Sequence, residues 1–232
     1  MKHKFQYIDF RQAMKGNNLP RKYYPLSNKV NIEKIIKLFP KPWIAFLDSG
    51  DYHYLTYFLL KNLSNKPYLI LFDNHFDMNY APDGMLSCGS WARQALIDDL
   101  IKGVLVIGAS SISKPTDFWH PGIIHIENPN DVINLNKYKN LFKYDLYISI
   151  DKDVLDSSIL RTDWDQGIMK EDSLLKWLSV FNSKGKVIGV DFCGDFKRDP
   201  VLELVDIKNK KAHERINRKI INLFTENYSK TA

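Results

Sequence analysis

The chain has 232 residues and a formal net charge of +6, and 44% of its residues are hydrophobic. This length and composition fit a single α/β domain over residues 1–232 with a sizeable core. No apolar run approaches the ~18 residues needed to span a bilayer, and the first residues contain no apolar stretch of signal-peptide length. The two cysteines do not suggest a disulfide framework. We therefore expect a soluble cytoplasmic protein that is not embedded in a membrane.

The positive charge is spread along the chain, and its densest run is KNKKAHERINRK at residues 208–219. Such a run can form a nucleic-acid surface or the solvated face of a helix. Glu214 interrupts the run, and no RNA-binding motif interleaves aromatic residues with Arg or Lys, so the helix face is favoured. We expect a small-molecule or side-chain substrate and no nucleic-acid partner. A homo-oligomer is left open.

Apolar runs alternate with helical patterns along the chain. Residues 4–10 predict a first strand, the polar segment up to residue 31 predicts a loop, and residues 32–39 predict a short helix that Pro40 ends. Further strands are predicted at residues 43–47, 68–72, 104–107, 122–126, 146–150 and 187–192. Helical spacing predicts helices that include Leu55, Phe58 and Leu59; Ala92, Ala95, Leu96 and Leu100; Leu174, Trp177, Leu178 and Phe181; and Ile216, Ile220, Leu223 and Phe224. This alternation predicts a three-layer αβα fold with a mainly parallel central sheet.

The stretch LILFDNHFDM places Asp73, His75 and Asp77 at every second position after an apolar run. The run is typical of a buried parallel strand, so these polar residues lie at its carboxyl end, where open α/β sheets place their ligands. Alternate residues of an extended chain point the same way, so the three side chains are expected to converge. Because such groups repel one another when crowded, the pattern predicts a metal site.

Four predicted strands end in groups able to bind a metal or a substrate. They are Asp51 and His53; Asp73, His75 and Asp77; Asp151 and Asp153; and Asp191 and Asp195. A lone Asp after a strand is often a helix cap, which is the plainer interpretation for Asp51 and Asp156. Capping does not account for D-x-H-x-D and D-x-D together. Carboxylates and imidazoles suit Mn²⁺ or a similar ion better than structural zinc, and their number favours two ions.

The chain resembles the arginase family, or ureohydrolases, over roughly residues 44 to 195. FDNHFDM is similar to the family's D-A-H-x-D strand end, and SIDKDVLD matches its S-x-D-x-D-x-x-D motif. DQGIMKEDSLL and SGDYHYL resemble two further family segments more weakly. The resemblance implies one Mn²⁺ held by His53, Asp73, Asp77 and Asp151, and a second held by Asp73, His75, Asp151 and Asp153. It also implies that Asp156 orients a ligand or the substrate from further out.

The sequence departs from the family at three places. Where arginases carry a His-Gly pair whose histidine shuttles protons, this chain has Cys88, which either shuttles protons or is a small buried residue beside a turn. Where arginases grip the guanidinium with a glutamate, this chain has Gly194, and Asp195 beside it takes that role if the backbone shifts by one residue. An inserted Tyr52 leaves a choice between Asp51 and His53 as metal ligand, and the family pattern favours His53.

These residues together predict a binuclear manganese hydrolase that cuts a non-peptide C–N bond of a guanidino, amidine or amide group. Two dications share a water and lower its pKa toward ~7, which makes hydroxide available for attack on the planar carbon. Two alternatives stay open: a single-metal deacylase of the related deacetylase type, and a metal-binding relative without turnover. The missing His-Gly pair and the missing glutamate support the last of these.

Overall fold

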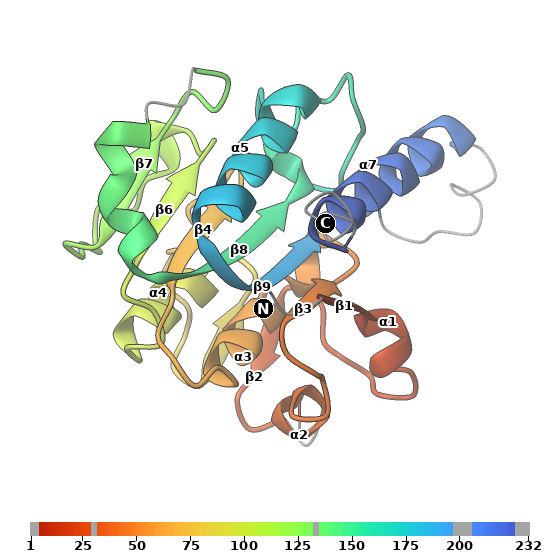
Figure 1. Ribbon diagram of the computed structural model, residues 1–232. Coiled ribbons are helices and arrows are strands. Elements are labelled where there is room, and N and C mark those ends of the chain that lie inside the picture. The colour runs from red at the N-terminus through yellow and green to blue at the C-terminus, as the bar shows by residue number, and fades with distance from the viewer. Residues whose placement is uncertain (1–4, 29–31, 132–134, 197–205, 226–232) are drawn as a thin grey trace.

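A computed structural model describes residues 5–28, 32–131, 135–196 and 206–225 (Figure 1). Its centre is a seven-stranded sheet in the order β1-β3-β9-β8-β4-β6-β7, and every neighbouring pair is parallel. The strands are β1 (Gln6–Asp9), β3 (Trp43–Phe46), β4 (Tyr68–Phe72), β6 (Gly103–Ile107), β7 (Ile123–Ile126), β8 (Asp145–Asp151) and β9 (Lys186–Cys193). The predicted strands are confirmed, with small shifts at their ends.

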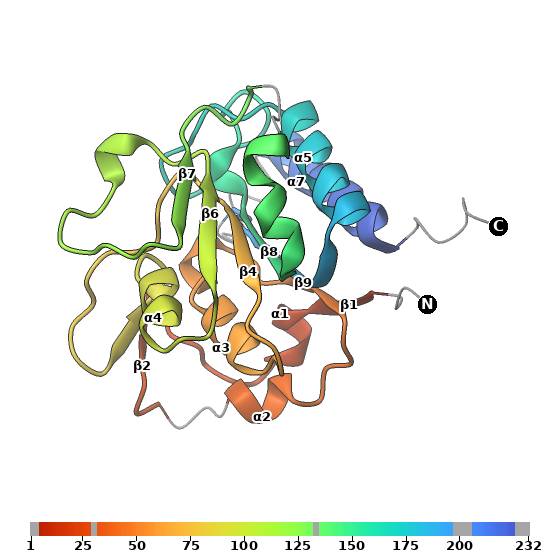
Figure 2. The same cartoon turned by 60° about the vertical axis from the view of Figure 1, so that its left-hand side comes forward.

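Helices cover both faces of this sheet, as Figure 2 shows. On one face lie α1 (Phe10–Ala13), α2 (Ile32–Ile36), α3 (Leu55–Lys61) and α4 (Trp91–Ile97), and their buried side chains form one apolar cluster. On the other lie α5 (Glu171–Lys184) and α7 (Ile207–Thr225), which share a second cluster. All five residues of β4 are buried, because a central parallel strand packs on both faces. The predicted three-layer αβα fold is confirmed.

Short elements that the sequence did not predict complete the chain. The segment expected as a loop before residue 31 contains α1 and β2 (Tyr23–Pro25), and the loop after β4 contains β5 (Met85–Ser87). β2 and β5 pair antiparallel, with Tyr24 opposite Leu86. A three-residue strand carries no local pattern, and these two form because the fold brings them together. Short 3₁₀ turns occupy Gly50–Tyr52, Ser111–Ser113, Leu135–Lys143 and Lys152–Val154.

The strand order reverses between β4 and β8. From β4 the chain continues to the neighbouring β6 and β7, whereas from β8 it continues to β9 on the opposite side. Ligands of open parallel sheets bind outside the carboxyl ends of strands at such a reversal. The ends of β3, β9, β8 and β4 are consecutive there, so residues far apart in the sequence meet at one edge. No helix among the described residues is long and apolar enough to cross a membrane.

Candidate metal centre

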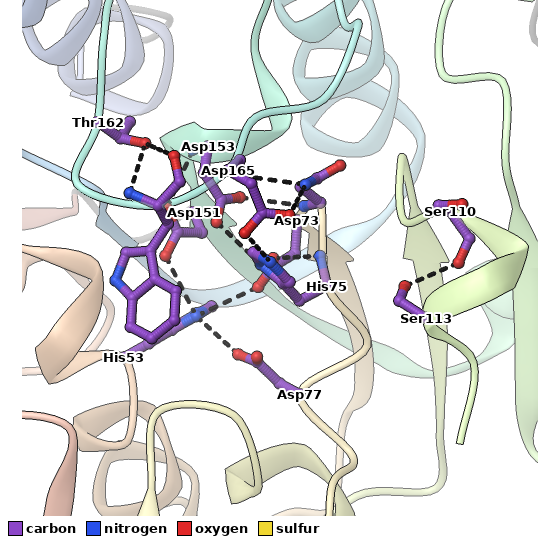
Figure 3. Close-up of polar contacts among 12 residues, drawn as sticks. His53, Asp73, His75, Asp77, Ser110, Ser113, Asp151, Asp153, Thr162 and Asp165 are labelled. Atoms are coloured by element: carbon purple, nitrogen blue, oxygen red, sulfur yellow. Dashed lines mark hydrogen bonds and ion pairs between the residues drawn. The ribbon is translucent and has the colours of Figure 1, made fainter. Parts of the chain in front are cut away.

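Six predicted ligands gather at this edge of the sheet (Figure 3). β4 ends at Phe72, and the chain then bends, so Asp73, His75 and Asp77 do not continue as an extended strand. Asp77 adopts φ +52°, and its carbonyl accepts hydrogen bonds from the first amides of α4. The three side chains therefore converge through a turn and not through strand alternation, which corrects the predicted reason while keeping the predicted cluster.

Three carboxylates of the cluster are each held by a backbone amide. The Oδ1 atom of Asp73 accepts from the His75 amide at 2.7 Å. Oδ1 of Asp151 accepts from the Asp153 amide, and Oδ1 of Asp153 from the Asn74 amide, both at 3.0 Å. The Oδ2 atoms of Asp73 and Asp153 face the neighbouring histidines, whereas Oδ2 of Asp151 accepts from the Cys193 thiol at 3.1 Å. Asp151 thus caps the Lys152–Val154 turn and contributes to the cluster with the same side chain.

His53 follows the Gly50–Tyr52 turn after β3, and its ring is fixed from behind. Its Nδ1 atom faces Asp77 Oδ2 at 2.9 Å and Asp73 Oδ2 at 3.3 Å. Its Nε2 atom lies 2.8 Å from the hydroxyl of Ser149, which donates to Asp191 at 2.6 Å. An outer carboxylate acting through a hydroxyl sets the tautomer and orientation of a metal-binding imidazole. This chain of contacts leaves Nδ1 free to bind an ion.

His75 is oriented in a similar way by a different carboxylate. Its Nδ1 atom faces Asp153 Oδ2 at 3.0 Å and Asp73 Oδ1 at 3.3 Å, while its Nε2 atom lies 3.1 Å from Asp165. Asn74 ties Asp165 in place by donating to both its carbonyl and its carboxylate. The loop that carries Asp165 therefore supports His75 from the solvent side.

The ligand atoms divide into two adjacent groups. His53, Asp73 and Asp77 form one group, and Asp73, His75 and Asp153 form another, each with its atoms within 4.8 Å of one another. Asp73 belongs to both, as a bridging carboxylate would. Asp151 Oδ2 lies 3.7 Å from His53 Nδ1 and forms a third group with His53 and Cys193. Each of these groups could hold one ion.

The electrostatics of the cluster fit bound cations. Asp73 is 1% exposed, and its Oδ2 atom has no hydrogen-bond donor among the described residues. Burial, followed by the charge of Asp153, raises the pKa of Asp151 to about 7. Burial, followed by the charge of Asp73, raises the pKa of Asp153 to about 7 as well. Buried carboxylates that resist ionisation beside one another are the donor set that a divalent ion stabilises.

The ligands line a pocket with a volume of about 380 Å³, which suits a small molecule. Cys88 lines this pocket, as do Lys22 and Trp164, which the sequence did not single out. Burial, with the charges of Asp77 and Asp51, raises the pKa of the Cys88 thiol to about 12. Cys88 therefore keeps its proton at neutral pH. Its predicted role as a proton shuttle stays a prediction.

The structure separates His53 from Asp51. Asp51 faces away from the cluster and accepts from Arg21 Nε at 2.7 Å, so His53 is the residue of this pair that meets the other ligands. Asp156 accepts from the Ser158 amide at 2.8 Å in a local turn and does not line the pocket. No helix among the described residues begins there, so Asp156 stabilises a turn and does not cap a helix, and its predicted role in orienting a ligand stays a prediction.

Asp195 and Asp191 lie elsewhere than the sequence suggested. Asp195 forms an ion pair with the fully buried Lys152 and contacts Asn217 of α7, so it is not placed to grip a substrate in the pocket. Asp191 lies inside β9, not after it, and accepts from Ser149 and Tyr147 behind His53. Asp191 is therefore not one of the groups that meet at the sheet edge, whereas the predicted catalytic role of Asp195 stays a prediction.

Three supporting residues were missed by sequence reasoning. Ser149 stands two positions before Asp151 in the matched S-x-D-x-D motif, so strand alternation could have placed it on the same face. Trp91 donates to Asp77 at 2.5 Å and packs on His53 with ring centroids 4.8 Å apart. Asp165 comes from a distant loop. No local pattern signals Trp91 or Asp165, since their contacts arise only on folding.

Solved structures with a similar fold include enzymes of one family. Formimidoylglutamase from Bacillus subtilis superposes with a TM-score of 0.65 at 19% identity, covering 86% of this chain and 66% of its own. Agmatine ureohydrolase of Thermoplasma volcanium gives a TM-score of 0.67 at 16% identity, covering 100% of this chain and 93% of its own. Trypanosoma cruzi formiminoglutamase, whose structure contains Mn²⁺, gives 0.61 at 14% identity and covers 84% of this chain and 70% of its own.

Sequence comparison gives the family directly. An uncharacterized protein of Thermotoga maritima is 33% identical over 185 residues, which cover 79% of this chain and 68% of the relative. The sequence pattern of the arginase family matches residues 44–194, which run from β3 to the end of β9 and include all six predicted metal ligands. This chain therefore belongs to the arginase family.

Proposed function

We propose that this protein is a hydrolase that uses two Mn²⁺ ions to cleave a non-peptide C–N bond. One observation carries the proposal: four buried carboxylates and two imidazoles from three strand ends converge, and Asp73 Oδ2 lacks any donor among the described residues. Bound cations relieve the repulsion among such buried carboxylates. Manganese is suited to the carboxylate and imidazole donors of this set, which needs no thiolate ligand.

His53, Asp73, Asp77 and Asp151 would hold one ion, and Asp73, His75, Asp151 and Asp153 the other. When bound, two such ions lower the pKa of a shared water to near neutrality and so supply a nucleophile. The chain's own contribution is positional. Ser149 and Asp165 fix the two imidazole rings, and the backbone amides that hold Asp73, Asp151 and Asp153 keep one oxygen of each carboxylate facing inward.

A leaving nitrogen needs a proton, and we propose that Cys88, which lines the pocket, gives it. The raised pKa keeps the thiol protonated at neutral pH, and Cys88 lines the pocket beside Gly89. Cys88→Ser tests this role: a donor function predicts a lower kcat with nearly unchanged KM, because the proton is needed in the transition state and not for binding. An unchanged kcat would leave Cys88 as a packing residue.

The experiment for the function as a whole combines metal content with product detection. The purified protein is loaded with Mn²⁺, dialysed, and its metal counted by elemental analysis. It is then screened for urea, ammonia or acid release from guanidino, amidino and acylated compounds. Two ions per chain with release of one product supports the proposal. About one ion per chain favours a deacylase, and two ions with no product from any compound favours a metal-binding relative without turnover.

A further inference from the structure

The acidic residues that line the pocket are all candidate metal ligands. Its carboxylates among the described residues are Asp73, Asp77, Asp151 and Asp153, and all four belong to the candidate metal centre. Two divalent ions would bring four positive charges against these four negative ones, so the centre would be neutral until the shared water is deprotonated. No carboxylate of the described lining is then left to balance a positively charged substrate, such as a guanidinium.

The position where a guanidinium-binding glutamate was expected cannot carry a side chain. Gly194 has φ +84°, which disfavours other residues, and a Cβ atom there would collide with Asp151 Oδ1 and lie 2.7 Å from the Lys152 amide. The neighbouring Asp195 is turned to Lys152. Neither Gly194 nor Asp195 is therefore placed to replace that glutamate.

One cation of the pocket has no acidic partner among the described residues, and it is Lys22. Its backbone is fixed, because its amide donates to Asp51 O at 3.1 Å and its carbonyl accepts from the Cys88 amide at 2.9 Å. Its Nζ atom lies 4.7 Å from the ring centroid of Trp164, which also lines the pocket. The adjacent Arg21 differs, since Asp51 neutralises it at 2.7 Å. Lys22 thus presents an uncompensated positive charge at the mouth of the site.

We propose that the substrate carries an anionic group, remote from the scissile C–N bond, that pairs with Lys22, and that its reactive end is uncharged, as in a ureido or amide group. This inference rests on the proposed hydrolase function for the meaning of the reactive end. The ammonium of Lys22 attracts a carboxylate or phosphate, and Trp164 holds the lysine side chain over the pocket through its ring face. The cavity volume of about 380 Å³ limits the substrate to a small molecule.

Four small molecules test separately the charge of the reactive end and the charge of the remote group of the substrate. Ureidobutyrate and carbamoylputrescine share an uncharged reactive end and differ in a distal carboxylate or ammonium. Guanidinobutyrate and agmatine form the same pair with a guanidinium. Dissociation constants are measured by titration calorimetry on the Mn²⁺-loaded full chain. We expect ureidobutyrate to bind most tightly and agmatine most weakly, with a preference that decreases as salt is added.

Charge variants at Lys22 test the assignment directly. Lys22→Met is expected to weaken ureidobutyrate binding about two- to fivefold, since a charge-assisted contact at an exposed site is lost. Lys22→Glu is expected to reverse the preference toward carbamoylputrescine. Lys176→Glu, on the exposed side of α5, makes the same change in net charge away from the pocket and should leave all four constants unchanged. Circular dichroism confirms that each variant is folded.

The outcomes separate this inference from the proposed function. Carboxylate probes that bind no better than their amine counterparts, or a preference that Lys22→Glu leaves intact, would overturn the inference. Hydrolysis of agmatine without binding of ureidobutyrate supports the hydrolase and refutes the anion site. A Lys22-dependent preference for carboxylates in a protein that hydrolyses none of the probes supports the anion site and counts against the hydrolase.

Discussion

The substitution Asp151→Asn should change the stability of the protein in opposite directions with and without metal. Asp151 is 4% exposed and stands between Asp153 and Asp73. Without bound ions the ionised carboxylate of Asp151 destabilises the folded chain, because burial and these neighbours raise its pKa to about 7. A group whose pKa is raised on folding costs stability once the pH exceeds its unfolded value, and the cost is complete above the folded value. With ions bound, the same carboxylate is a ligand.

The size of each effect follows from these values. Because one pKa unit is worth about 1.36 kcal/mol, a pKa of about 7 in place of 3.8 corresponds to at most about 4 kcal/mol. This cost is shared with the neighbouring Asp153, whose charge contributes to the raised pKa, so we expect Asp151→Asn to gain about 1–2 kcal/mol in chelator at about pH 8. Excess Mn²⁺, at ~1,000 times its dissociation constant, stabilises the native chain by about 4 kcal/mol, most of which the variant loses.

Thermal denaturation followed by circular dichroism, in EDTA and in excess Mn²⁺, measures both effects. The variant should melt a few degrees above the native chain in EDTA and about 5–10 °C below it in Mn²⁺. Asp83→Asn, an exposed position outside the pocket, provides the matched loss of one carboxylate and should behave as the native chain in both conditions. A variant that loses equal stability in EDTA and in Mn²⁺ would show that Asp151 is a structural residue and refute the metal assignment.

Three further predictions follow from the site. Manganese affinity should rise about tenfold or more per pH unit up to about pH 7, because binding displaces protons from Asp151 and Asp153. Calorimetry in two buffers should detect the released protons, and an affinity that does not change with pH would contradict this prediction. Ser149→Ala separates His53 from Asp191 and should weaken metal binding about 10- to 100-fold by equilibrium dialysis, and no loss would remove Ser149 from the support of the site. Gly194→Glu should lower metal content and yield no arginine hydrolysis, because its Cβ displaces Asp151, and a variant with two ions and urea release from arginine would contradict the packing argument.

Local sequence patterns were enough to predict the layered fold and the ligands of the D-x-H-x-D and D-x-D motifs. Short apolar runs followed by Asp and His identify buried parallel strands and their carboxyl ends, and hydrophobic burial enforces that pattern wherever the strands pair. Since parallel strand ends share one edge, the D-x-H-x-D and D-x-D motifs had to meet. His53 was also identified, although the choice over Asp51 came from a family resemblance and not from local chemistry.

Which polar groups support the site, and which contact other partners instead, depends on the tertiary structure. Asp191 and Asp195 follow the same local rule as the ligands, yet one is buried behind His53 and the other is drawn to Lys152 and α7. Asp165 and Lys22 sit in loops that carry no periodic pattern, and their positions depend on contacts with Asn74 and Trp164 far along the chain. A local sequence pattern records which face a residue takes within its own element, whereas the partner that a side chain meets depends on how distant elements are packed against each other.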